Sequence, residues 1–146
     1  MRIAGYSIAG GADDEASVPH NDRVEFDEGA VVAGLRTSGA KFAFVHGSRA
    51  TGNAWHHSDL DVGAWWGGAA PAPWDVPLPP HVDLVVLDDA PLWLAGRIAL
   101  HGRLLFDDAP PERVAWQADT RLIYLDELPQ ILESQQEWLR AVSGGR

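Results

Sequence analysis

The sequence predicts an α+β domain, in which helices pack on a small mixed β-sheet. Four short runs rich in β-branched and aromatic residues predict strands, and apolar residues at helical spacing lie between and after them. The predicted order is helix, strand, short helix, strand, strand, helix, strand, helix, which favours one sheet with helices on it. A chain of 146 residues with 46% apolar side chains is long enough for one such core and too short for two.

The first half of the pattern leads directly to a Gly-Ser pair. Apolar positions within 26–38 predict a helix that Gly39 ends. Residues 41–45 predict a strand that runs into Gly47, and residues 50–54 predict a brief helix after it. The sequence therefore predicts a turn from a strand into a helix at this point.

The second half alternates strands, a Pro-rich loop and helices. Residues 58–66 and 81–87 predict strands on either side of a loop at 71–80, and 103–106 predict a last strand. Asp88 and Pro91 are typical of a helix N-terminus, with an acidic cap and Pro inside the first turn. The apolar stripe of that helix contains Leu92, Leu94, Ala95 and Ile98.

A long helical tail begins at Pro110, and Pro129 is expected to break or kink it. Four apolar positions at helical spacing favour a face of the tail that packs on the sheet over a face that forms a groove for a partner: Val114, Ala118, Leu122 and Leu125. Tyr124 is assigned to packing, and Trp93 is expected in the core.

Composition excludes several classes of protein. A net charge of −10 disfavours sequence-independent binding to nucleic acid, which requires Lys and Arg. Without cysteine there is neither a disulfide nor a thiolate site, and no apolar run approaches the roughly 18 residues of a membrane span. The chain is therefore expected to be cytoplasmic. Residues 1–21 are expected to form a flexible N-terminal arm, followed by a single domain at 22–146 with a helical tail.

The Gly-Ser pair is a candidate phosphate cradle. A strand that ends in Gly47-Ser48 and turns into a helix presents free backbone N–H groups to an anion. Gly47 lets the backbone approach a phosphate closely, Ser48 adds a hydroxyl donor and Arg49 adds a cation. Gly-Ser-x-x-x-Gly also occurs in ordinary turns, so the cradle indicates a function only in combination with the residues after it.

Three carboxylates lie after the cradle at informative spacing. Asp59 and Asp61 are two residues apart in a predicted strand, so they share a face, and Asp83 interrupts the apolar run of the next strand. A lone Asp-x-Asp is commonly a solvated strand edge. Carboxylates brought together repel one another unless cations lie among them, and their hard oxygens select Mg²⁺ or Mn²⁺. The conjunction predicts a metal site next to a phosphate site.

These residues resemble the nucleotidyltransferase superfamily of the DNA polymerase β type, and more closely its minimal nucleotidyltransferases (MNT). The resemblance covers roughly residues 24–141 and includes Val82–Val85, Gly102–Leu105 and Arg121–Asp126. These features look like the antitoxins of HEPN–MNT toxin–antitoxin pairs. The resemblance implies an Mg²⁺-dependent adenylyltransferase that transfers AMP from ATP to a tyrosine of a HEPN ribonuclease toxin and silences it.

The resemblance also implies roles for individual residues. Gly47, Ser48 and Arg49 would bind the nucleotide, Asp59 and Asp61 would hold metal, and Asp83 would ligate metal and accept the proton of the attacking hydroxyl. Thr51 stands where many relatives carry a second basic residue, and the arm and the loop at 67–80 are outside the pattern.

Two other functions stay open. A small-molecule nucleotidyltransferase of the aminoglycoside-modifying type would need an acceptor domain that residues 107–146 scarcely supply, and a non-catalytic antitoxin would have no need of the three carboxylates. His56 and His57 could ligate a transition metal but lack the usual spacing. Four tryptophans expected near the active-site face could stack on adenine or dock a partner: Trp55, Trp65, Trp66 and Trp74.

Overall fold

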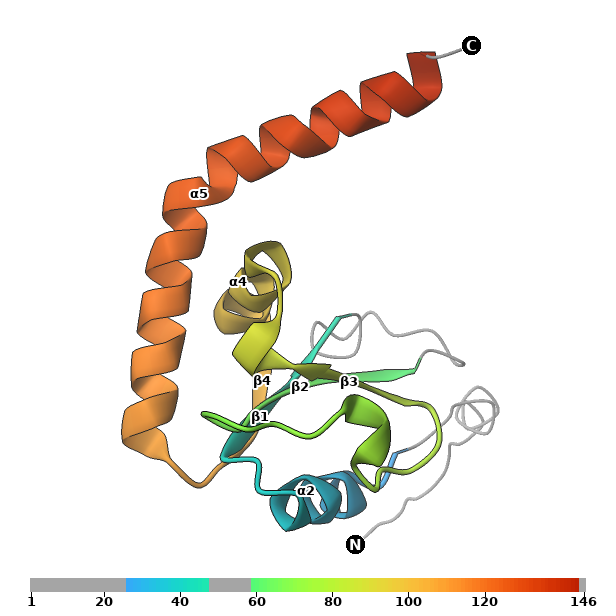
Figure 1. Cartoon of the computed structure of the whole chain (residues 1–146), viewed down its shortest axis with the longest axis vertical. Coiled ribbons are helices and arrows are strands. Elements are labelled where there is room, and N and C mark those ends of the chain that lie inside the picture. Colours follow the sequence, from blue (N-terminus) through green and yellow to red (C-terminus); the bar gives the residue numbers. More distant parts are fainter. Residues whose placement is uncertain (1–25, 48–58, 145–146) are drawn as a thin grey trace, which may run out of the picture.

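The computed structural model describes residues 26–47 and 59–144, which form an α+β fold around a four-stranded mixed sheet (Figure 1). The strands lie in the order β3-β2-β1-β4. Their bounds are Phe42–His46 for β1, Leu60–Trp65 for β2, Val82–Val86 for β3 and Arg103–Asp107 for β4. β1 is antiparallel to both of its neighbours, whereas β2 and β3 are parallel. The predicted fold class and strands are confirmed; the arm at 1–21 and the helix at 50–54 lie outside the described residues.

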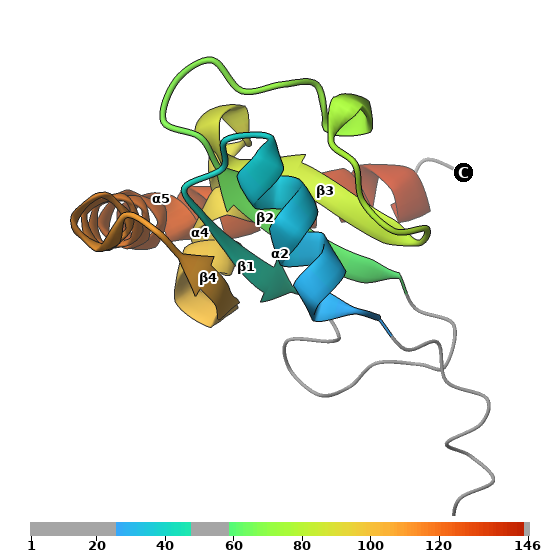
Figure 2. The ribbon, with the colours of Figure 1, turned by 90° about the horizontal axis from the view of Figure 1, so that it is seen from below.

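Two helices cover opposite faces of the sheet. Helix α2 spans Glu28–Thr37, with Asp27 as its N-cap, and α4 spans Leu92–His101. Figure 2 shows α2 lying across the near face of the strands and α4 behind them. Both helices end close to the positions that the sequence predicts, because their apolar spacing and flanking Gly residues mark the ends.

Strand alternation divides the core into two clusters. On β1, Ala43 and Val45 pack on the α2 side, together with Val62 and Ala64 of β2. Phe42 and Phe44 point to the α4 side, where they pack with Leu87 and Ile98. Because both faces of β1 are covered, the strand reads as a continuous apolar run.

Asp88 does not cap α4 as the sequence predicts. The N-cap of α4 is Pro91, which has no capping side chain. A 3₁₀ turn at Leu87–Asp89 instead places the Asp88 carboxylate at the end of β2. There it accepts hydrogen bonds from three backbone N–H groups, those of Trp66 (2.8 Å), Gly67 (2.6 Å) and Gly68 (3.1 Å). The carboxylate therefore satisfies backbone N–H donors of the turn after β2. The predicted cap was wrong because these donors are distant from Asp88 in sequence.

Helix α5 spans Pro110–Gly144 and bends sharply about half-way along its length (Figure 1). Pro129 lies inside the helix, lacks an N–H and crowds the carbonyl four residues earlier, which accounts for the predicted kink. The first half runs beside α4, whereas the second half extends past α4 to the C-terminus (Figure 1).

The face of α5 that packs differs from the predicted one. Tyr124 is buried, and it lies so close to Gly96 of α4 that any Cβ there would collide with the ring. Gln117 and Arg121 donate hydrogen bonds to the carbonyl of Ala99, at 3.0 and 2.7 Å. The assignment of Tyr124 to packing is thus confirmed.

The predicted stripe is largely solvent-exposed. Leu122 is 71% exposed, and Val114 and Leu125 are each about half exposed. Trp93 is 44% exposed, so its predicted place in the core is also wrong. The physical reason is that α5 packs on α4, and meets the sheet through Trp116 against Phe42 and Phe44, so a different face is buried.

None of the helices in the described part of the chain is long and apolar enough to cross a membrane.

Candidate functional site

His46, Asp61 and Asp83 lie in a row across three strands; we call them the carboxylate row. Asp61 is the register partner of Asp83 in the parallel β2–β3 pair and of His46 in the antiparallel β1–β2 pair. Alternation puts all three on the α4 side of the sheet, since a Cβ at Gly63, two residues after Asp61, would lie against Leu87 and Ile98. The sheet thus brings together two carboxylates that are 22 residues apart in sequence.

Asp59 lies just before β2, two residues from Asp61. Its Oδ1 is 3.5 Å from Nδ1 of His81, and both side chains are substantially exposed. His81 adopts a positive φ of 65° immediately before β3. Leu60 between the two aspartates is buried, as alternation along a strand requires when its neighbours face the other way.

The backbone of Gly47 passes directly over the carboxylate of Asp61. Gly47 has a φ of 74°, a region that residues with a side chain rarely adopt. A Cβ at this position would lie 2.5 Å from Oδ2 of Asp61. The first residue of the predicted cradle is therefore held against the carboxylate row, and only glycine fits there. Ser48 and Arg49, and the pair His56 and His57, lie outside the described residues.

His46 ends β1 next to Gly47, and the sequence motifs assigned it no role. Its Nε2 is buried and has no hydrogen-bond partner among the described residues. Burial lowers the pKa of His46, the Asp61 carboxylate opposes this shift, and the charge of Arg97 on α4 adds to it. The lowered pKa favours the neutral form of the imidazole. Its position two residues after Phe44 on a strand was the available signal, since alternation places both on one face.

The chemistry of the donor set suits a hard divalent cation. Among residues 26–47 and 59–144, no three His, Asp or Glu side chains form a group that could hold a metal ion by themselves. Mg²⁺ does not require one, because it keeps several waters and is commonly bound by one or two carboxylates together with substrate phosphates. Asp61 and Asp83, adjacent in register and beside Gly47, fit that mode of binding.

Two of the tryptophans expected near the site have structural roles instead. Trp65 stacks on Phe42, with ring centroids 5.1 Å apart. Trp66 is buried, and its Nε1 donates to the carbonyl of Ser38 at 2.9 Å. Trp74 is 84% exposed beside the 3₁₀ turn at Pro73–Asp75, and Trp55 lies outside the described residues.

No protein-family model and no curated protein matches the sequence, but solved structures match the fold. One is a toxin–antitoxin complex with AMP-PNP: the TM-score is 0.63 at 18% identity, over 77% of this chain and 98% of that chain. A mutant MntA–HpeT toxin–antitoxin complex gives a TM-score of 0.65 at 19% identity, over 79% and 99%. This chain has the fold of an MNT antitoxin.

A third match supports the same fold. It is a tri-AMPylated Shewanella oneidensis HEPN toxin in complex with an MNT antitoxin, with a TM-score of 0.57 at 15% identity over 84% of this chain and 99% of that chain. The nucleotidyltransferase fold predicted from Gly47, Asp59, Asp61 and Asp83 is therefore confirmed as a fold. At these identities the likeness carries no residue roles, which rest on the geometry above.

Proposed function

We propose that this chain is an adenylyltransferase antitoxin, which transfers AMP from ATP to a tyrosine hydroxyl of a HEPN-family toxin. The observation that carries the proposal is the register pairing of Asp61 with Asp83 beside the close approach of Gly47. Support comes from solved structures of the same fold, one of which contains AMP-PNP and another a tri-AMPylated HEPN toxin.

The nucleotide would be held where β1 ends. Gly47 offers backbone without a Cβ, and Ser48 and Arg49 would add a hydroxyl donor and a cation for the β- and γ-phosphates. The lowered pKa of His46 beside them favours the neutral imidazole, so this side chain contributes little positive charge at this end of the sheet.

Asp59, Asp61 and Asp83 would hold Mg²⁺ or Mn²⁺ together with the phosphates. When bound, such a cation neutralises charge that develops on the transferred phosphoryl group and on the leaving pyrophosphate. Asp61 is fixed from two sides, by its partners on β1 and β3, which suits a group whose position has to be maintained through the reaction.

Asp83 would act as the proton acceptor. In the proposed step the tyrosine oxygen forms a bond to the α-phosphorus of ATP, and the bond from that phosphorus to the bridging oxygen breaks. Pyrophosphate leaves with the electron pair, and the hydroxyl proton passes to the Asp83 carboxylate. Asp83 is exposed at the start of β3, where a protein tyrosine can reach it.

The test is incubation of the full chain with ATP labelled at the α-phosphate, Mg²⁺ and the purified cognate HEPN protein. Label on a tyrosine of that protein, located by mass spectrometry, is the expected result. Label that appears only on an added aminoglycoside would replace the proposal with a small-molecule transferase. Stable binding without label would replace it with an antitoxin that acts by contact alone.

A further inference from the structure

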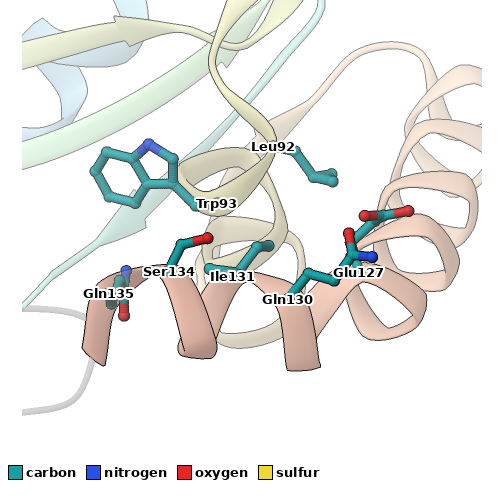
Figure 3. A pocket seen from close by; sticks show the side chains of 7 residues that line it. All are labelled: Leu92, Trp93, Glu127, Gln130, Ile131, Ser134 and Gln135. Atoms are coloured by element: carbon teal, nitrogen blue, oxygen red, sulfur yellow. The ribbon is translucent and has the colours of Figure 1, made fainter. Parts of the chain in front are cut away.

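The bend in α5 creates an open groove between its second half and α4. The groove has a volume of about 540 Å³, and Figure 3 shows side chains of both helices around it. Its lining consists of Leu92 and Trp93 from α4 and of Glu127, Gln130, Ile131, Ser134 and Gln135 from α5. The wall is mainly apolar, and the Glu127 carboxyl group supplies negative charge to it (Figure 3). Trp93, which is exposed rather than in the core, thus lines this groove.

The groove continues towards the C-terminus. A second hollow of about 380 Å³ shares Ser134 and Gln135 with the first and adds Trp138 and Leu139. We call the residues that line these two hollows the docking surface. From Pro129 to Gly144 the helix has 16 residues, a length of about 24 Å, and four large apolar side chains there are at least half exposed: Leu132, Trp138, Leu139 and Val142.

The apolar residues have the spacing of a helix that packs on another helix. Leu132 and Leu139 are seven residues apart, as are Ile131 and Trp138. A seven-residue apolar repeat forms a stripe along one side of a helix. Among the described residues, only α4 contacts α5 extensively, so this stripe is left for another molecule.

Charge selects the kind of molecule. From Asp126 onwards α5 carries four acidic side chains against one basic, Arg140, and the whole chain has a net charge of −10. A second copy would bring like charges together, which costs free energy, whereas Lys and Arg beside the apolar residues of a partner would pair with Glu127 and its neighbours. The favoured occupant is a basic amphipathic helix.

We propose that the docking surface binds a helix of the acceptor protein, one that presents apolar side chains flanked by Lys or Arg. The identity of the acceptor rests on the proposed function; the chemistry of the surface does not. An apolar anchor of the partner would enter the groove beside Trp93 and Ile131, and its basic rim would face Glu127. The acceptor is thereby held by a surface separate from the carboxylate row.

The double substitution Trp138→Ser with Leu139→Ser tests the surface by isothermal titration calorimetry, with the full chain and the cognate HEPN protein. Since both side chains are exposed, the melting temperature of the double variant should equal that of the wild type. Its Kd for the HEPN protein should rise at least about 30-fold, as when a buried interface anchor is removed. Leu122→Ser is the matched control, because Leu122 is an exposed apolar residue of α5 outside the docking surface, and its Kd should equal that of the wild type. Glu127→Gln should make Kd less dependent on salt.

The outcomes separate this proposal from the proposed function. An Asp61→Asn chain that binds the HEPN protein with wild-type Kd supports a separate docking surface. If the wild type binds through this surface but transfers no label, the docking proposal stands and the adenylyl-transfer proposal fails. Wild-type Kd in the double variant, or no binding by the wild type, overturns docking. Sedimentation that shows a wild-type dimer and a monomeric double variant also overturns it, because the occupant is then a second copy.

Discussion

The carboxylate row and the docking surface are built in opposite ways. The row consists of polar groups on three paired strands, with the buried side chains of Val45, Val62 and Val86 on the other side of the sheet. The docking surface consists mainly of apolar groups on a helix that continues past its last contacts (Figure 1). Groups that react need fixed positions, whereas a surface that captures a partner needs area and exposed apolar side chains.

The two regions also differ in what holds them. The row is fixed by backbone hydrogen bonds across β1, β2 and β3. Helix α5 is held by side-chain contacts instead: Tyr124 packs on Gly96, two side chains donate to the Ala99 carbonyl, and Trp116 packs on Phe42 and Phe44. Substitutions should therefore abolish transfer without affecting binding of the acceptor, or weaken binding without altering the row.

The largest expected effect is on the row itself. Asp61→Asn keeps the shape of the side chain but removes the charge that would hold a cation, so adenylyl transfer should fall at least about 100-fold. Label transferred per minute is the measurement, with calorimetric Kd for the HEPN protein as the second readout. Asp75→Asn, an exposed carboxylate away from the row, is the matched control. Transfer at the wild-type rate in Asp61→Asn would remove the row from the mechanism.

The second largest effect is expected at the contact between Gly96 of α4 and Tyr124 of α5. Gly96→Val places a branched side chain where even a Cβ collides with the Tyr124 ring, so the free energy of unfolding should fall by about 3 kcal/mol. Urea denaturation measures this change. Gly144→Ala is the control, because a Cβ there meets nothing within 4 Å in the same α5 helix. An unchanged unfolding midpoint for Gly96→Val would mean that α5 is not held by this contact.

Local pattern was sufficient to predict the strands and the two aspartates of the row. Each strand has its own period of two or its own apolar run, and Asp61 and Asp83 interrupt those runs at matching positions. The errors concern contacts between elements distant in sequence. The stripe with Leu122 was predicted on the assumption that α5 covers the sheet, whereas Gly96 admits Tyr124 and another face of α5 is buried. Trp93 was placed in the core from its helical pattern alone, whereas its side chain lines the groove between α4 and α5.

Asp88 illustrates the same limit. Its sequence position before Pro91 fits a helix cap, and only the three-dimensional course of the turn after β2 brings three N–H groups to its carboxylate. His46 received no predicted role, because a single histidine after an apolar strand belongs to no motif, although alternation places it in the row. Pairing of strands, rather than any local signal, gives such residues their neighbours.

A third substitution probes the contact between the cradle and the row. Gly47→Ala has to adopt a φ of 74° and place a methyl group against Oδ2 of Asp61, which should cost about 1–2 kcal/mol. We expect a modest loss of stability and a larger loss of transfer, since either Asp61 or the backbone has to shift. Gly68→Ala, where a Cβ meets nothing and φ is ordinary, is the matched control. Kd for the HEPN protein should stay at the wild-type value in both variants.

The smallest effect is expected where neither region is involved. Arg36 donates two hydrogen bonds of 2.8 Å to Asp108, and this interaction lowers the pKa of the Asp108 carboxyl group. A lowered pKa in the folded state stabilises the fold above the carboxyl pKa of the unfolded chain, about 3.9, and this stabilisation is lost as pH falls through the folded value. Because both side chains are about half exposed, solvent screens the pair and the contribution is small. Asp108→Asn should therefore melt slightly below the wild type at pH 7, and the two melting temperatures should converge once the pH falls below the lowered pKa of Asp108. Asp89→Asn, the control, should melt as the wild type does at each pH. A difference in melting temperature between variant and wild type that grows as the pH falls would show that Arg36 is not the cause of the shift. A loss of transfer or of binding in Asp108→Asn would show that this ion pair is coupled to the two functional regions.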